Sequence, residues 1–352
     1  MQAIDLGCCE VAMQAAFILG SARCGSTLVS DIINLHPDLL SLSEVFSAAG
    51  ARAFPHGPLT GAQFWRDQSR PDRIVSAVAN PRRAPNEFLY GRVANPRDDP
   101  WHCPPILSIA LPHLSDRPDD LFDWLTERAT AQPPQPVQDH YRAVFTTLAR
   151  ERGRKVWVER SGGSLAAART LYQLFPEGRF VLLTRNGPDT ALSMKDYPAS
   201  RLAIRMADAF RPFGIDLLDP DSHYGRGRVW PQLQKLGWML PVSYLLDTPP
   251  DLARVGAFWS TMVVRGIAAY AAIPPERRMH LAYEDLVARP EQEIHRLGTF
   301  LCGNAPESWV SAAARLPQAR PSRADALPRA ERERLEAACA PGAAALRSLT
   351  GG

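Results

Sequence analysis

The sequence lacks any long apolar segment. None of its apolar stretches reaches the roughly 18 residues that a membrane helix needs. The first residues include Asp5 and Glu10 and have neither a basic region nor a continuous apolar core, which argues against a secretory signal. We therefore expect a cytoplasmic protein without a membrane span.

Cysteine is also scarce, and its spacing argues against the common metal sites. The six cysteines among 352 residues form no CxxC pair and show no Cys/His ligand spacing. In a cytoplasmic chain we expect free thiols, without a disulfide framework and without a bound metal.

An excess of charge of one sign is absent as well. The sequence has 40 Lys and Arg against 37 Asp and Glu, a net charge of +3, and no basic block resembles a nucleic-acid-binding tail. This balance favours a local anion site and no nucleic-acid partner. The abundance of Ala, Arg and Pro is typical of a GC-rich bacterial source.

Short apolar runs followed by helical patterns predict a parallel sheet. The predicted strands are residues 15–19, 155–159, 180–184 and 279–283. The predicted helices are residues 27–35, 164–175, 188–194, 252–270 and 291–301. The alternation predicts an α/β fold of three layers with a central parallel sheet, P-loop-like and with helical insertions, in one domain over residues 1–352.

Two regions do not fit this alternation. Residues 50–150 are rich in proline and aromatic side chains and are too long for a plain connection. We interpret them as an insertion of short helices that covers the acceptor site. Residues 211–250, which include a Gly-Arg-Gly-Arg run at 225–228, are the second such region, and we interpret them as a lid.

The strongest motif is the glycine-rich segment at residues 20–27, directly after a strand and at the start of a helix. It fits the phosphate-loop pattern G-x-x-x-x-G-x-T, except that Ser26 stands where nucleotide triphosphatases place lysine. The backbone can still bind an anion through helix N–H groups, and Gly25 permits the tight turn. Arg23 then supplies the positive charge.

The residues after the strand at 180–184 argue against a magnesium-dependent phosphoryl transfer. Such a site needs Mg²⁺, usually held in part by an acidic residue that ends a nearby strand. Here the strand is followed by Arg185 and Asn186. A sulfuryl group carries less charge than a phosphoryl group, so an arginine and N–H donors could suffice without a metal.

The loop resembles that of the sulfotransferases that use 3'-phosphoadenosine 5'-phosphosulfate (PAPS), which carry Pro-(Arg/Lys)-Ser-Gly-Thr-Thr. Residues 22–27 match it with Ala for Pro and Cys for the first Ser. The resemblance implies that the loop binds the 5'-phosphosulfate. The implied contacts are Arg23, Cys24, Gly25, Ser26 and Thr27.

A second family element is an Arg and a Ser eight residues apart that hold the 3'-phosphate. Arg185 and Ser193 have this spacing, within a run similar to the family's Arg-Asn-Pro-x-Asp. Related enzymes also bring a C-terminal basic loop onto the 3'-phosphate, and Arg323 is the candidate here. A solvated arginine-rich surface is the alternative for Arg323.

A base must accept the proton of the acceptor hydroxyl. Many family members have a helix, then His-Pro, then a glutamate, and here a His-Pro pair at 36–37 precedes Glu44, 21 residues beyond Arg23. The resemblance implies that Glu44 is the base. Alternatively, Glu44 caps the next helix or pairs with an arginine. Since another branch of the family uses a histidine, the rival bases are His56, His102, His113 and His140; we interpret His36 as structural.

Residues 157–161 resemble the family's Trp-x-Glu-Lys-(Ser/Thr) segment, with Arg160 in place of the lysine. Arg160 could approach the leaving oxygen or the adenosine end, and Glu159 could orient Arg160 or Arg23. A surface ion pair is the alternative for both.

The resemblance implies transfer of a sulfuryl group from PAPS to a hydroxyl group, with the nucleotide PAP as product. The composition of residues 50–150 favours a small-molecule, lipid-like or polyketide-like acceptor of secondary metabolism over a polysaccharide. The alternatives are a kinase-like enzyme that uses ATP and Mg²⁺, and a non-catalytic module that binds PAP. The sequence leaves the oligomeric state open.

Overall fold

The structure is a computed structural model, and the residues that it describes are 13–80, 82–83, 88–221, 223–226 and 241–350.

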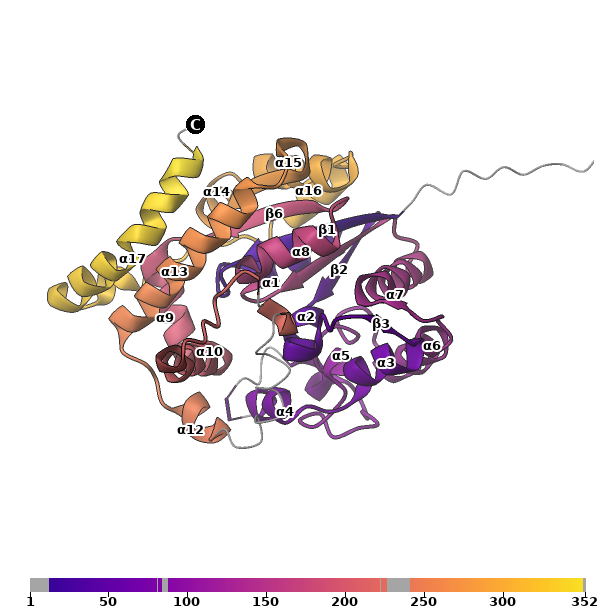
Figure 1. Cartoon of the computed structure of the whole chain (residues 1–352). Coiled ribbons are helices and arrows are strands. Elements are labelled where there is room, and N and C mark those ends of the chain that lie inside the picture. The colour runs from indigo at the N-terminus through magenta and orange to yellow at the C-terminus, as the bar shows by residue number, and fades with distance from the viewer. Residues whose placement is uncertain (1–12, 81, 84–87, 222, 227–240, 351–352) are drawn as a thin grey trace, which may run out of the picture.

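A five-stranded parallel sheet lies at the centre of the molecule (Figure 1). Its strand order is β2-β5-β1-β6-β7, and every pairing is parallel. The strands are β1 (Gln14–Gly20), β2 (Leu39–Ser43), β5 (Val156–Ser161), β6 (Arg179–Thr184) and β7 (Arg278–Ala282). The predicted α/β fold is confirmed, and all four predicted strands lie in this sheet.

The central strand β1 is apolar after Gln14 because both faces of the sheet are covered. Phe17 and Leu19 belong to one apolar cluster, and Ala16 and Ile18 belong to the other. All four side chains are at most 1% exposed. Continuous apolar sequence is expected of a parallel strand that is buried on both faces.

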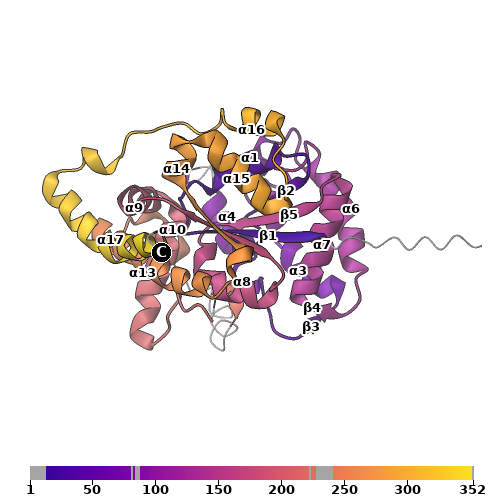
Figure 2. The same ribbon diagram turned by 90° about the horizontal axis from the view of Figure 1, so that it is seen from above.

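Helices form a layer on each face of the sheet (Figure 2). The layer that packs on Phe17 and Leu19 contains α7 (Val137–Glu151), α8 (Ala168–Leu174) and α13 (Leu252–Ala271). The opposite layer contains α1 (Ser26–Asn34), α15 (Pro290–Cys302) and α16 (Glu307–Ala313). The three predicted layers are therefore present.

The predicted helices lie close to the observed ones. The helix expected over 164–175 begins as a 3-10 turn, η3 (Ser164–Ala167), and the helix expected over 188–194 is α9 (Gly187–Asp196). The strand expected over 279–283 ends at Ala282, because Tyr283 already begins α14 (Tyr283–Ala288).

Residues 50–150 contain short helices, as expected of the insertion. They are η1 (Gly50–Arg52), α3 (Gly61–Ser69), α4 (Arg73–Ala79), η2 (Leu89–Arg92), α5 (Pro105–Ser108) and α6 (Pro118–Thr130). A small antiparallel pair of strands, β3 (Pro58–Leu59) and β4 (Gln135–Pro136), joins the two ends of the region before α7.

The described part of the region at 211–250 consists of three short helices. They are η4 (Arg211–Phe213), η5 (His223–Gly225) and α12 (Val242–Asp247). The second half of the Gly-Arg-Gly-Arg run, residues 227–228, lies outside the described residues. The interpretation of this region as a lid stays a prediction.

The C-terminal helix α17 (Arg329–Thr350) lies along α13 in both views (Figures 1 and 2). The Ser260 hydroxyl of α13 donates a hydrogen bond to the Ala338 carbonyl at 2.8 Å. Within the part of the chain that the structure describes, neither α17 nor any other helix is long and apolar enough to cross a bilayer.

Candidate functional site

The loop after β1 holds residues in the left-handed region of backbone conformation. Ala22, Arg23 and Gly25 have φ values of 63°, 55° and 96°. A Cβ atom on Gly25 would lie 2.5 Å from Cδ2 of Tyr283, so a larger residue would meet both backbone strain and a steric clash. Turns of this kind form concavities that bind anions through backbone N–H groups.

The start of α1 leaves this concavity open to an anion. No side chain caps the helix at Gly25, and the first turn contains no acidic residue. The unpaired N–H groups and the positive end of the helix dipole therefore favour a phosphate group at this place.

Arg23 connects the loop to α9. Its Nε donates a hydrogen bond to the Ser193 hydroxyl at 3.1 Å. Its guanidinium also lies over the Tyr197 ring, 4.6 Å from the ring centre. The structure thus brings together the two elements that the family resemblance assigns to the two ends of PAPS.

Arg185 lies between β6 and α9 and faces the same cavity. Its guanidinium is held over the Tyr283 ring, 4.7 Å from the ring centre. Its Nε is buried and has no hydrogen-bond partner among the described residues. Because a buried N–H without a partner is costly, this atom is a candidate contact for a bound oxyanion.

Glu44 lies in the single-residue junction between β2 and α2 (Val45–Ala49), in the left-handed conformation with φ 59°. Its Oε1 accepts a hydrogen bond from Arg160 at 2.5 Å, and its Oε2 accepts one from the Gly162 N–H at 2.8 Å. The Ser47 hydroxyl also donates to Oε2. The side chain is 20% exposed and lines the cavity. Glu44 is therefore paired with an arginine and is still accessible from the cavity.

Arg160 is the link between Glu44 and the loop. Its side chain is 5% exposed, and its Nη1 lies 3.4 Å from the Ser26 hydroxyl as well as against Glu44. The alternative of a surface ion pair is therefore wrong for Arg160, which is buried at the end of β5.

The cavity at this end of the sheet has a volume of about 730 Å³. Its charged and hydroxyl-bearing lining residues include Arg23, Ser26, Thr27, Glu44, Arg160, Arg185, Ser193 and Arg320. Its apolar lining residues include Ile74, Val75, Val78, Phe88, Ile109, Leu202, Met206, Leu217 and Leu218. Most of the latter form a single apolar cluster between α4 and α10 (Pro198–Phe210). The cavity therefore offers both an anion site and a contiguous apolar wall.

Cys24 differs from its neighbours in the loop. Its side chain is fully buried in the apolar cluster of α1, and it does not line the cavity. Burial raises the pKa of the thiol to about 11, so the thiol stays protonated. Any contact of Cys24 with the donor is left to its backbone.

The arginine of the C-terminal segment that lines the cavity is Arg320, not Arg323. Arg323 forms a surface ion pair with Asp196 at 2.6 Å. The segment is attached to α9 because the Asp189 carboxylate accepts hydrogen bonds from the Arg323 and Ala324 N–H groups. The sequence indicated the segment, and the structure places Arg320 at the cavity.

The four rival histidines are engaged elsewhere, and none of them lines the cavity. The partners are Arg226 for His56, Ser76 for His102, Ser43 and Asp31 for His113, and Gln132 and the Leu59 carbonyl for His140. His36 is buried against Trp309 and hydrogen-bonds Asn304, in keeping with a structural role.

His223 is the histidine that lines the cavity, and no sequence motif indicated it. Its Nδ1 is buried without a hydrogen-bond partner in the described part of the chain. Burial lowers the pKa of its imidazole to about 4, so the ring is neutral near pH 7. A neutral ring can accept a hydrogen bond from a hydroxyl group but is a weak base.

Across the residues described, no cluster of three or more His, Cys, Asp or Glu side chains is arranged to hold a metal ion.

Comparison with known proteins gives one match in sequence and several in structure. A family model described as "Sulfotransferase family" matches residues 15–219, which is more than half of the chain. None of the curated proteins matches the sequence.

Several solved structures are similar to this chain, among them these three. The sulfotransferase domain of the Synechococcus PCC 7002 olefin synthase is 16% identical, with 90% of this chain and 80% of that one covered and a TM-score of 0.40. The sulfotransferase domain from the curacin biosynthetic pathway is 14% identical, with 92% and 97% covered and a TM-score of 0.43. A sulfotransferase from Alicyclobacillus acidocaldarius is 16% identical, with 96% of both chains covered and a TM-score of 0.41.

Proposed function

The chain belongs to the sulfotransferase family, and from this premise we propose that it transfers a sulfuryl group from PAPS to a hydroxyl group of an apolar small molecule. The observation that carries the proposal is the hydrogen bond between Arg23 and Ser193, which joins the loop to the proposed 3'-phosphate element. We also propose that residues 1–352 act as one cytoplasmic domain.

The residues of the site fit a donor with phosphate groups at both ends. The uncapped start of α1 and Arg23 would bind the 5'-phosphosulfate. Arg185, whose Nε is buried without a partner in the described structure, would bind the 3'-phosphate with Ser193. PAPS, when bound, supplies the sulfuryl group together with its phosphate leaving group.

Glu44 is proposed as the base. As the acceptor oxygen bonds to sulfur and the bond from sulfur to the phosphate oxygen breaks, the Glu44 carboxylate takes the hydroxyl proton. Arg23 and the N–H groups of the loop stabilise the charge that remains on the phosphate oxygen. Arg160, which contacts both Glu44 and Ser26, holds the base beside the loop.

The apolar wall is proposed as the acceptor site. The two regions that do not fit the alternation of strands and helices both contribute to this wall. Val78 and Phe88 come from residues 50–150, and Leu218 comes from residues 211–250. These side chains favour an acceptor with an apolar body, such as a lipid-like or polyketide-like alcohol.

The donor is tested by isothermal titration with PAP, ADP and ATP, each with and without Mg²⁺. We expect PAP to bind without metal and far more tightly than ADP, because Arg185 and Ser193 contact the 3'-phosphate. Tight binding of ATP with Mg²⁺ but not of PAP would instead support a kinase-like enzyme.

Transfer is tested with radiolabelled PAPS and two acceptors, 1-decanol and 2-naphthol. Glu44→Gln should lower the rate at least a hundredfold while the affinity for PAP changes little. Glu177→Gln, which removes an exposed carboxylate paired with Arg142, is the control. If PAP binds and neither acceptor is sulfated, the result favours a non-catalytic PAP-binding module.

A further inference from the structure

Two segments that meet at the end of the sheet contact each other residue by residue. Residues 44–47 contain Glu44 and the start of α2, and residues 159–162 contain the end of β5 and the residue that follows it. We infer that Glu159 and Ser161 are positioning residues that hold Glu44 in place for proton transfer. This inference rests on the proposed function of Glu44.

Glu159 and Ser161 bind the first amides of α2. The Oε1 atom of Glu159 accepts a hydrogen bond from the Phe46 N–H at 3.3 Å and another from the Ser161 hydroxyl at 2.6 Å. The oxygen of that hydroxyl accepts a hydrogen bond from the Ser47 N–H at 3.1 Å. The two side chains thus satisfy amides that a helix cannot satisfy at its own start.

The residues between and after them bind Glu44 itself. The carbonyl of Arg160 accepts a hydrogen bond from the Glu44 N–H at 2.7 Å, and the Gly162 N–H donates to the Glu44 carboxylate at 2.8 Å. Every residue from 159 to 162 therefore contacts the segment at 44–47.

Glu44 needs such support from its surroundings. A residue other than glycine at φ 59° is strained, and it keeps this conformation only where neighbouring groups enforce it. The helix that follows has five residues, too few to fix its own start. The conformation of Glu44 therefore depends on the bonds from residues 159–162.

The surroundings of Glu159 suit this role. The side chain is 1% exposed, and its Oε2 has no hydrogen-bond partner among the described residues. The titratable groups around it are Glu44, Arg160, Tyr141 and Tyr224. Burial raises the pKa of the Glu159 carboxyl to about 8. A mostly protonated acid can accept both hydrogen bonds through Oε1 without placing a second negative charge beside Glu44.

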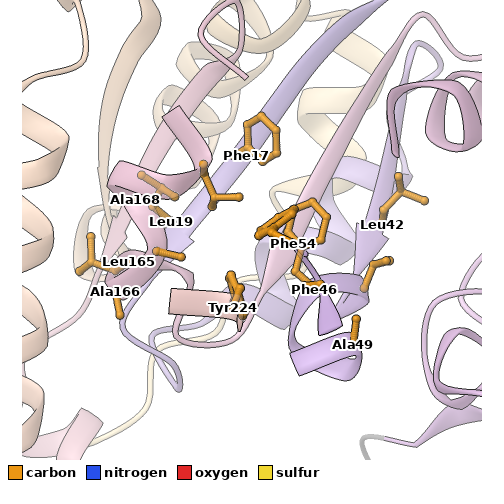
Figure 3. Packing of buried hydrophobic residues seen from close by; sticks show 14 of the residues in the cluster. Phe17, Leu19, Leu42, Phe46, Ala49, Phe54, Leu165, Ala166, Ala168 and Tyr224 are labelled. Carbon is orange, nitrogen blue, oxygen red and sulfur yellow. The ribbon is translucent and has the colours of Figure 1, made fainter. Parts of the chain in front are cut away.

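Tyr224 packs against Phe46 of α2 from a different part of the chain. Its ring lies 6.2 Å from that of Phe46 and 5.8 Å from that of Phe54, and Figure 3 shows these rings gathered above the sheet. The Phe46 and Ser47 amides donate their hydrogen bonds to Glu159 and Ser161, so exchange at these two amides reports on those bonds.

The test compares Glu159→Gln, Glu159→Ala and Ser161→Ala by amide hydrogen exchange, titration with PAP, and transfer from PAPS to 2-naphthol. Glu159→Gln keeps an oxygen for both bonds, so exchange at Phe46 and Ser47 and kcat should stay within about threefold of wild type. Glu159→Ala should raise both exchange rates and lower kcat at least tenfold, while Kd for PAP stays within twofold.

Ser260→Ala is the matched control because it removes two hydrogen bonds between α13 and α17, outside the cavity lining. It should change neither exchange at Phe46 nor kcat. If Glu159→Ala does not fold, Ser161→Ala, which frees the Ser47 amide, decides the question in the same way.

Two results would overturn the inference. One is wild-type exchange in Glu159→Ala, and the other is equal loss in Glu159→Gln and Glu159→Ala. Failure of the proposed function looks different, because a wild-type protein that neither binds PAP nor transfers sulfate still gives the exchange comparison.

Discussion

Replacement of Glu159 by glutamine should change how the stability of the protein depends on pH. The carboxyl has a pKa near its usual 4.5 in the unfolded chain, and burial raises the pKa to about 8 in the folded one. Between these values the folded state holds a proton that the unfolded state has lost. Stability is therefore highest below pH 4.5 with respect to this group and falls as the pH rises to about 8.

The size of the effect follows from the two pKa values. The difference between 4.5 and about 8, at about 1.4 kcal/mol for each pH unit, gives roughly 5 kcal/mol as an upper limit. Glutamine does not titrate, so the free energy of unfolding of Glu159→Gln should rise relative to wild type by up to about 4 kcal/mol between pH 5 and pH 8. Above about pH 8.5 the difference should be constant.

The measurement is urea unfolding of both proteins at several pH values from 5 to 9, followed by tryptophan fluorescence. Other groups, His223 among them, titrate in both proteins and cancel in the difference. Parallel curves over the whole range would refute the reasoning, because they would mean that Glu159 is ionised in the folded protein at pH 5.

Three further predictions concern the cavity. Arg185→Ala should weaken PAP binding about 10- to 100-fold and leave ADP binding unchanged, as measured by titration, whereas Arg323→Ala should alter neither. Gly25→Ala should weaken PAP binding more than tenfold because of its positive φ and the contact with Tyr283; wild-type affinity would contradict this. The transfer rate should show no histidine step between pH 6 and 8, since the His223 pKa is about 4, and a step lost in His223→Gln would identify His223 as the base.

The strands could be predicted from the sequence because burial on both faces leaves a continuous apolar run. Residues 15–19 and 180–184 are such runs, and β1 and β6 extend beyond them by one residue or less at each end. The helix α17 was missed because its arginines suggested a solvated surface. Leu335 and Cys339, which pack against Gly256 of α13, have helical spacing, but the Pro341-Gly342 pair that follows them is typical of a helix end.

The candidate site also contains residues that the sequence predicts and residues that it does not. Arg23, Arg185 and Glu44 follow strand ends, and parallel strands bring such residues to one edge of the sheet. His223 reaches the cavity through a turn in which the next residue, Tyr224, has φ 55° and packs on η1 and α2. Nothing in the local sequence encodes that contact, which depends on two surfaces far apart in the chain.

Tyr283 has a consequence for how this site can vary. Its ring lies so close to residue 25 that only glycine fits there, and the same ring also supports the guanidinium of Arg185. It lies beyond residue 219, where the match to the family ends. A fragment of the matched residues would keep both of the proposed phosphate-binding segments but lose the side chain that contacts Gly25 and Arg185. Related chains with a different residue at 283 should therefore differ in the reach between the two phosphates that they accept.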